Sequence, residues 1–103
     1  MTEVEKLYEL AGVEKDWESM PYGDIRESYP PFTAKKQIEI LQFCLKWGQV
    51  HILQGIDDEY RIENCCYRQG YQPTIADAIA NYINEKWEKL TPEEHKQIKE
   101  ILE

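Results

Sequence analysis

The side chains that most often bind metals or act as nucleophiles are few in this 103-residue chain. Its two histidines, His51 and His95, stand far apart, and neither has a histidine or cysteine at the spacing of a zinc motif. Its three cysteines, Cys44, Cys65 and Cys66, form no C-x-x-C pair. The five glycines stand singly rather than in a phosphate-binding loop. We therefore predict no metal site, no cofactor and no nucleophilic catalysis.

Carboxylates are the most abundant groups with a potential for chemistry. The chain has 20 acidic and 12 basic residues and a formal net charge of -8, and the excess of acids lies toward its two ends. No spacing singles out a pair of carboxylates for acid–base catalysis, so we predict that the protein is not an enzyme. A negative field repels phosphate backbones and disfavours direct nucleic-acid binding. Two interpretations of the charge remain: it keeps the protein in solution, or it forms a surface complementary to a basic partner.

The most unusual stretch is residues 12–32, where acidic and aromatic side chains are mixed without helical or strand periodicity. Pro21, Gly23, Pro30 and Pro31 interrupt it, so we predict a long irregular loop. Two interpretations are open: the loop wraps the core and buries its aromatic side chains, or it presents them to a partner. The candidate partner-binding residues in this loop are Asp16, Trp17, Glu18, Tyr22, Asp24 and Glu27. The exposure of its tryptophan and of Tyr22 separates the two interpretations.

Two further groups of charged residues are candidates for recognition. Asp57, Asp58 and Glu59 form an acidic run in a predicted turn, and we add them to the candidate partner-binding residues. The run lacks the ligand spacing of a twelve-residue calcium loop. An alternative function is the binding of a small molecule or nucleotide signal, for which the candidate contacts are Lys35, Arg61, Tyr67 and Arg68. That alternative requires the basic side chains to meet in one pocket.

Four predicted helices must position these residues, and each begins at a threonine that can cap it. The predicted caps are Thr2, Thr33, Thr74 and Thr91. The last of them opens a capping box, with Pro92 at the first helical position and Glu94 at the third. In the second helix, Ile38, Leu41 and Leu45 form the main apolar stripe, widened by further apolar residues. We expect this helix to be the most buried.

Residues 49–54 and 59–67 are predicted to form a β-hairpin between the second and third helices. Ile62 indicates that the face it shares with Tyr60 and Asn64 points inward. The first strand offers two inward sets, Val50 with Ile52 or His51 with Leu53. An isolated hairpin is marginal in water, so a third strand at 68–72, a covering helix or edge pairing in a homodimer must support it.

These elements predict a single α+β domain spanning residues 1–103. It has a small antiparallel sheet of two or three strands packed against helices, in the order α-α-β-β-α-α. Neighbouring cysteines on a strand point to opposite faces and are poorly placed to bond each other, which favours a reducing compartment. The N-terminus lacks the pattern of a signal peptide, and no apolar run approaches the length of a membrane span. We therefore predict a cytoplasmic protein with no membrane partner.

Short blocks covering about half of the chain resemble small uncharacterised phage and prophage proteins of Gram-positive bacteria. They are residues 4–13 (VEKLYELAGV), 29–40 (YPPFTAKKQIEI), 76–80 (ADAIA) and 87–102 (WEKLTPEEHKQIKEIL). The order of helix, hairpin and helix is also similar to a phage sandwich domain, in which a small sheet lies between helices. The resemblance carries no catalytic residues, and it implies a phage accessory protein acting in the cytoplasm of a bacterial host.

The predicted function is therefore non-enzymatic. We expect a protein that binds a host protein through an acidic surface, as an anti-CRISPR-type inhibitor of host defence does. A basic nucleic-acid-binding protein or nuclease is the expected kind of partner, with binding that weakens as salt rises. The alternatives are a small-molecule or nucleotide-signal binder and a phage protein without inhibitory activity.

Overall fold

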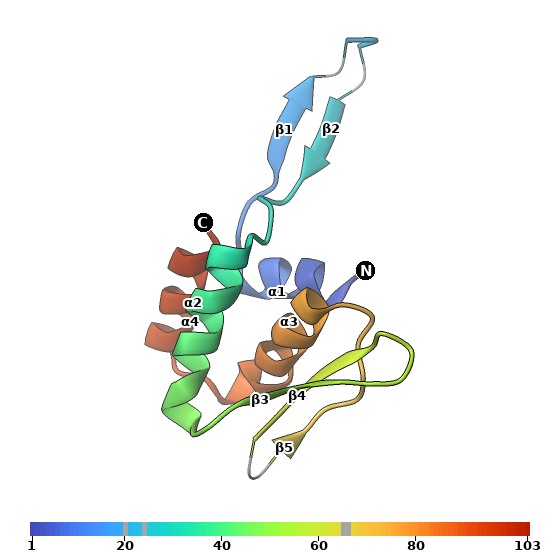
Figure 1. Cartoon of the computed structure of the whole chain (residues 1–103). Coiled ribbons are helices and arrows are strands. Elements are labelled where there is room, and N and C mark those ends of the chain that lie inside the picture. Colours follow the sequence, from blue (N-terminus) through green and yellow to red (C-terminus); the bar gives the residue numbers. More distant parts are fainter. Residues whose placement is uncertain (20, 24, 65–66) are drawn as a thin grey trace.

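The computed structural model confirms the predicted α+β fold class, with helices and two small antiparallel sheets (Figure 1). It describes residues 1–19, 21–23, 25–64 and 67–103, and of these residues 18, 19, 67 and 68 by their backbone alone. The helices are α1 (Glu3–Ala11), α2 (Ala34–Cys44), α3 (Ile75–Lys86) and α4 (Pro92–Leu102), and the 3₁₀ turns η1 (Leu45–Trp47) and η2 (Trp87–Lys89) extend α2 and α3. The strands are β1 (Asp16–Ser19), β2 (Ile25–Ser28), β3 (His51–Gln54), β4 (Tyr60–Asn64) and β5 (Tyr67–Arg68).

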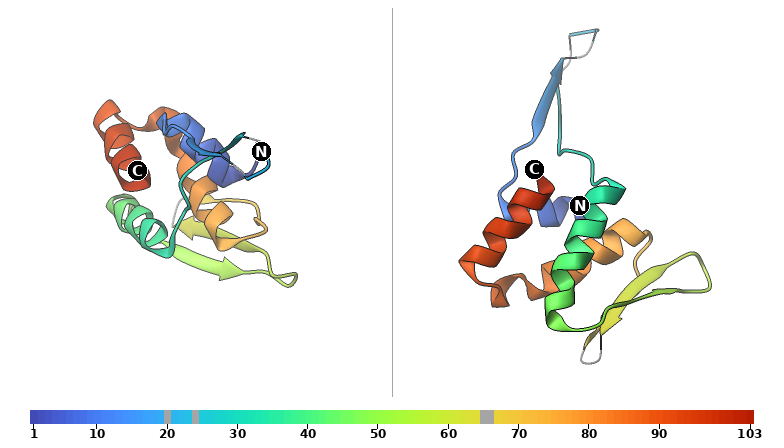
Figure 2. Two further views of the ribbon diagram at one scale, coloured as in Figure 1. Left: turned by 90° about the horizontal axis from the view of Figure 1, so that it is seen from above. Right: turned by 60° about the vertical axis from the view of Figure 1, so that its left-hand side comes forward.

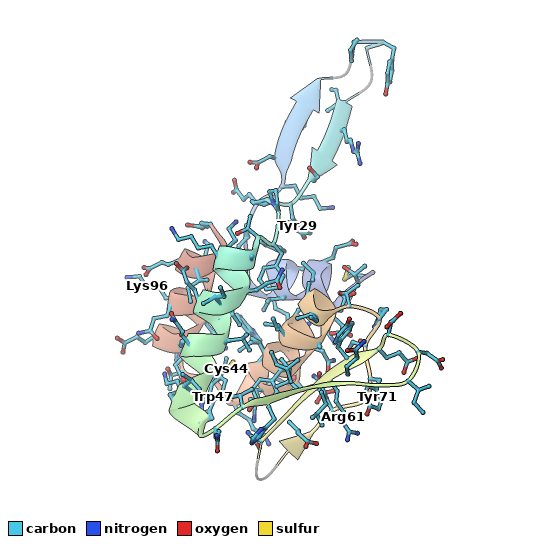
Figure 3. The ribbon with its side chains drawn as sticks, in the orientation of Figure 1. Tyr29, Cys44, Trp47, Arg61, Tyr71 and Lys96 are labelled. Atoms are coloured by element: carbon cyan, nitrogen blue, oxygen red, sulfur yellow. The ribbon has the colours of Figure 1, made fainter. Side chains whose placement is uncertain are left out.

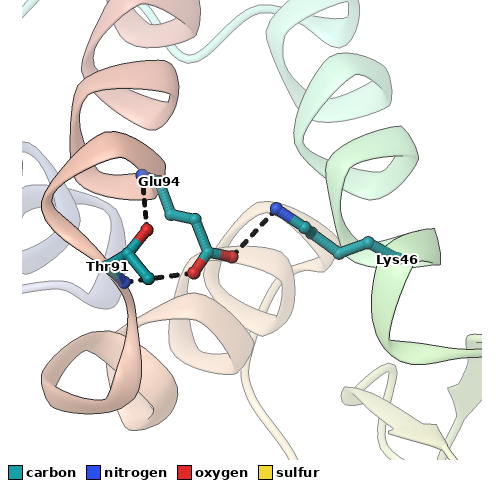
Figure 4. A network of polar contacts seen from close by, with 3 residues as sticks. All are labelled: Lys46, Thr91 and Glu94. Carbon is teal, nitrogen blue, oxygen red and sulfur yellow. Dashed lines mark hydrogen bonds and ion pairs between the residues drawn. The ribbon is translucent and has the colours of Figure 1, made fainter.

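Each helix begins at the threonine predicted to cap it. The side-chain oxygens of Thr2, Thr33, Thr74 and Thr91 accept a hydrogen bond from the backbone amide three residues later. At α4 the capping box is complete, because the Glu94 carboxylate also accepts from the Thr91 amide at 3.1 Å. The same carboxylate lies 2.9 Å from the Lys46 ammonium of η1 (Figure 4). This ion pair ties the start of α4 to the turn that follows α2.

Helix α3 lies at the centre of the molecule, and its residues from Asp77 to Asn84 are all buried. It packs on α1, α2 and β4, while α4 packs on α1 and α2. Two polar side chains of α3 hold the start of α1. The Asn84 amide donates to the Glu3 carbonyl oxygen at 2.9 Å, and the Asp77 carboxylate accepts from the Val4 amide at 3.3 Å.

Helix α2 is less buried than predicted. Its inward positions are Ile40 and Cys44, which are fully buried, whereas Ile38 and Leu45 are 55% and 58% exposed. The apolar residues of this segment form two overlapping stripes, and the one that includes Ile40 faces the core, where α2 packs on α3 and α4. The expectation that this helix is the most buried was therefore wrong, because α3 occupies the centre.

The second sheet has the strand order β3-β4-β5 and is antiparallel throughout. A third strand is therefore present, but it is the short β5 at Tyr67–Arg68 and not residues 68–72, of which Gln72 forms an isolated bridge with Tyr60. Ile52 of β3 pairs with Ile62 of β4, which is fully buried. Asn64, on the same side of β4, donates to the Tyr82 hydroxyl of α3 at 2.6 Å. The predicted inward face of β4 is confirmed, and Ile52 rather than His51 shares it.

The first sheet is a feature that the sequence did not predict. Residues 12–32 contain the antiparallel strands β1 and β2, with Asp16 opposite Ser28 and Trp17 opposite Glu27, instead of a long irregular loop. These strands project away from the helices as a narrow hairpin (Figures 1 and 2). The radius of gyration is 14.8 Å, against about 13 Å for a compact domain of this length. The projecting hairpin accounts for the difference.

Candidate partner-binding surface

The projecting hairpin carries most of the residues that the sequence singled out for partner binding. We call residues 14–28 the arm. Its strands contact mainly each other, and every described side chain of β2 is exposed. Trp17 is 70% exposed, Tyr22 71% and Ile25 65%. The aromatic side chains of the arm are therefore presented to solvent and do not cover the core.

Aromatic packing at its base fixes the arm to the body. The Tyr29 ring, just beyond β2, stacks on the Tyr8 ring of α1 with 5.2 Å between centroids and 10° between planes. The Lys15 ammonium lies 5.1 Å from the centroid of Tyr29, and Phe32 meets Tyr8 edge-on at 6.3 Å. On the other leg Val13 is buried. Both legs of the arm are thus held, which orients the hairpin before any partner arrives.

The strand register places the apolar side chains of the arm on one face. Trp17 is opposite Glu27, and Ile25 stands two residues from Glu27 on the same strand. Residues two apart on a strand share a face, and diagonal cross-strand neighbours are close enough for an aromatic ring to contact. Trp17 and Ile25 therefore form one apolar face, with Glu27 beside them.

A cleft of about 370 Å³ lies between α1 and the base of the arm. Its charged lining is balanced, with Lys15 and Arg26 set against Glu5 and Glu27. Tyr8 lines it as well, and burial raises the pKa of the Tyr8 hydroxyl above its usual value. The balance of charges gives the cleft no preference for an anion over a cation.

The arm is strongly acidic. Between residues 14 and 28 the sequence has five acidic side chains against two basic ones. Asp16 and Glu27 are exposed on β1 and β2. Asp24 and the side chain of Glu18 fall outside the described part of the structure. The predicted set of Asp16, Trp17, Tyr22 and Glu27 is brought together on this one element.

The second acidic group does not join the arm. Asp57, Asp58 and Glu59 are exposed in the turn between β3 and β4, at a distance from the arm in all views (Figures 1 and 2). Asp58 has a positive φ of 54° and accepts a hydrogen bond from the Gln54 side chain at 3.1 Å. Aspartate tolerates this left-handed conformation better than most residues, so Asp58 has a structural role in the turn.

The basic residues considered for small-molecule binding lie on separate elements. Lys35 is exposed at the start of α2, whereas Arg61 lies on β4 and packs over the Tyr71 ring at 4.7 Å (Figure 3). Arg61 also lies 3.7 Å from the Glu63 carboxylate. The side chains of Tyr67 and Arg68 lie outside the described part. Lys35 and Arg61 form no common pocket.

Cys44 and His95 pack on other residues of the fold, whereas the His51 side chain is exposed. Cys44 is buried against α3, and burial raises the pKa of its thiol to about 12 (Figure 3). The His95 ring stacks on Trp87 at 4.1 Å and bonds to the Trp87 carbonyl oxygen at 2.8 Å. His51 is exposed on β3. Among the described residues, no group of three or more histidine, cysteine or acidic side chains could hold a metal ion.

Ile25 belongs to the apolar face of the arm but was not among the predicted partner-binding residues. The sequence pattern that could have indicated a hairpin is short. It consists of four residues on each side of a segment that contains Pro21 and Gly23, with Trp17 and Ile25 as the apolar residues. Tryptophan and isoleucine favour strands, and proline with glycine favours a turn. A hairpin interpretation of this segment would have placed Ile25 next to Trp17.

Comparisons of the chain with protein-family models, with curated proteins and with solved structures found no match. Within the described residues, no helix combines the length and apolar character needed to cross a bilayer. The geometry of the arm and the charge of the chain are therefore the features that bear on function.

Proposed function

We propose that this protein is a non-enzymatic binding protein whose arm docks on a basic surface of a partner protein. The observation that carries the proposal is the exposure of Trp17 and Ile25 on one face of a hairpin that is held at its base and whose strands contact mainly each other. A two-stranded hairpin is at best marginally stable alone in water. Burying an aromatic or large aliphatic side chain contributes about 2 kcal/mol. Docking therefore stabilises the arm and supplies binding free energy at the same time.

The charge of the arm favours a basic partner. Glu27 lies on the apolar face beside Trp17, Asp16 is exposed on the opposite face of the hairpin, and the whole chain carries a net charge of -8. Acidic side chains around an apolar centre steer a positively charged surface toward it and reject acidic surfaces. This arrangement matches the usual organisation of an interface, with an aromatic anchor at its centre and charged residues at its rim.

We further propose the setting that the sequence resemblance implies. The protein acts as a phage or prophage accessory protein in the cytoplasm of a bacterial host, and its partner is a basic host protein such as a nucleic-acid-binding protein or nuclease. An acidic arm on such a surface competes with a phosphate backbone for the same cations. Binding of the arm to this surface is then sufficient to inhibit host defence, without a catalysed reaction.

The test compares the purified wild-type chain with the double variant Trp17→Ala/Ile25→Ala in affinity capture from a lysate of a Gram-positive bacterium. The matched control is Ile38→Ala/Leu45→Ala, because these residues of α2 and η1 have similar exposure, 55% and 58%. We expect wild type and control to retain the same basic protein at low salt. The arm variant should retain at least about tenfold less, equivalent to about 1.4 kcal/mol.

The captured protein is then purified and its affinity for each variant measured at low and high salt. Binding that weakens as salt rises and that depends on Trp17 and Ile25 supports the proposal. Equal affinity of the arm variant and the control, or binding that is insensitive to salt, contradicts it.

A further inference from the structure

The outer edge of β3 is a second surface that the fold leaves without a partner. In the strand order β3-β4-β5 one side of β3 is occupied by β4, and no described strand lies on the other. Ile52 is 45% exposed although it pairs with the buried Ile62. Beyond the end of the strand, Ile56 is fully exposed.

The hydrogen-bond pattern shows which backbone groups of β3 point outward. The Gly55 amide donates to the Glu59 carbonyl at 2.7 Å, so residues 53 and 55 belong to the hydrogen-bonded pairs of the β3–β4 ladder. Consistently, the backbone amide and carbonyl of Tyr60 point away from β3, and they exchange hydrogen bonds of 2.8 and 2.6 Å with the backbone of Gln72. Because successive residues alternate, Ile52 and Gln54 direct their amides and carbonyls toward the open edge.

The open edge lacks the features that usually prevent strands from pairing between molecules. Natural edge strands are commonly protected by lysine, proline, a bulge or an inward-pointing charge. Residues 47–56, which include β3, contain no aspartate, glutamate, lysine, arginine or proline. This is the longest uncharged run of the chain.

We propose that two copies of this chain pair through their β3 edges, antiparallel about a twofold axis, and form one continuous sheet. The charge of the chain favours a second copy as the partner at the open edge of β3. Two chains of net charge -8 repel each other over most of their surfaces and can approach at the uncharged run around β3. A basic partner is instead attracted to the acidic arm, and β3 offers it no countercharge.

The geometry of antiparallel pairing fits this occupant. A twofold axis perpendicular to the sheet keeps the Ile52 side chains of both copies on the same face, the one covered by α3. The exposed part of each Ile52 is then covered by the other strand. The arm projects from the opposite end of the molecule, so both arms of the dimer stay accessible (Figures 1 and 2).

The dimer does not depend on the proposed function of the arm, and its response to salt has the opposite sign. Salt screens the repulsion between two acidic chains and tightens the dimer, whereas it weakens the binding of a basic partner to the arm. A four-residue strand is small for an interface, so we expect a dissociation constant of roughly 1–100 μM.

The experiment is sedimentation equilibrium of the purified wild-type chain over concentrations from about 1 to about 500 μM, which bracket such a constant. The test variants are Ile52→Lys, which places a charge at the edge, and Gln54→Pro, which removes an outward amide. Proline is tolerated where an edge amide faces solvent, so the second variant keeps the β3–β4 ladder. The control is Ile38→Lys, the same substitution at an exposed isoleucine of α2. Circular dichroism confirms that each variant is folded.

We expect a wild-type dimer that tightens with salt, at least about tenfold weaker association in both test variants, and no change in the control. A monomeric wild type over the whole range overturns the inference. A dimer that survives both test variants, or one that is lost when Trp17 is replaced by alanine, also overturns it, because the contact then lies elsewhere.

Discussion

Gln69 is the residue whose structural role is hardest to see in the sequence. Its side-chain oxygen accepts from the Ile62 amide at 2.7 Å, and its side-chain nitrogen donates to the Ala78 carbonyl at 3.2 Å and to the Asn81 side chain at 2.7 Å. The side chain is almost fully buried. It therefore takes the place of a strand partner for β4 and joins the sheet to α3.

We predict that Gln69→Leu lowers the free energy of unfolding by roughly 1–3 kcal/mol, because it leaves the Ile62 amide buried without a partner. Urea unfolding followed by circular dichroism measures the change. Gln97→Leu on the exposed surface of α4 is the control and should change stability by less than about 0.5 kcal/mol. Equal stability of the two variants would show that water replaces the Gln69 bonds.

Cys44 gives a prediction about high pH. Burial raises the pKa of its thiol to about 12 in the folded chain, from an ordinary value of 9.0. Folding therefore keeps the thiol protonated, and its contribution to stability is complete below the unfolded pKa and lost as the pH rises toward 12. We expect the wild type to lose more stability than Cys44→Ala when the pH of a urea titration is raised from about 8 to about 10.

The same burial predicts low reactivity of Cys44. Iodoacetamide at neutral pH should leave Cys44 unmodified in the folded protein and alkylate it in urea, as judged by peptide mass mapping. Rapid modification of Cys44 without denaturant would mean that α2 separates readily from α3.

At the scale of elements, helix starts could be predicted because their causes are local. A threonine and the amide three residues later are sufficient to place a cap, and the four caps are present. The buried side of α2 could not be predicted in the same way. Stripes containing Ile38 and Ile40 overlap, and the positions of α3 and α4 decide which one is buried. The arm was missed because the described side chains of its four-residue strands are all exposed, so the strands show no core periodicity.

The start of α4 gives a prediction about acid. Hydrogen bonds from the Thr91 amide and from the Lys46 ammonium lower the pKa of the Glu94 carboxyl. A lowered pKa means that Glu94 contributes stability above its unfolded pKa and that this contribution is lost as the pH falls through the folded pKa. The wild type should therefore lose more stability than Glu94→Gln when the pH falls from about 6 to about 3.

Chemical denaturation at the two pH values measures this difference. Glu93→Gln removes a charge from the same helical turn without touching the capping box, so it should behave like the wild type. Identical acid sensitivity of the wild type and Glu94→Gln would remove the capping box and its ion pair from the causes of acid unfolding.

At the scale of the whole molecule, the sequence could supply candidate residues but not their grouping. Asp16 and Asp57 looked equivalent as members of acidic stretches, and the fold places them on separate projections (Figure 1). Proximity depends on how the helices pack, which no short stretch encodes. The exposure of Trp17 could not be predicted for the same reason. A tryptophan between two charged residues is compatible with burial in the core and with exposure on the surface.

The division into a body and an arm leads to a prediction for the whole chain. Asp16 and Ser28 pair across the base of the hairpin, so replacing residues 17–27 with Asn-Gly closes the two strands with a two-residue turn. The tyrosine stack at the base and the core below it remain intact. The shortened chain should therefore have a free energy of unfolding within about 1 kcal/mol of the wild type. It should still dimerise through β3 and should not bind the basic partner. Urea unfolding, sedimentation and the capture assay measure these properties separately.

A shortened chain that unfolds much more easily would show that the arm supports the core. One that keeps its partner would show that recognition lies on the body.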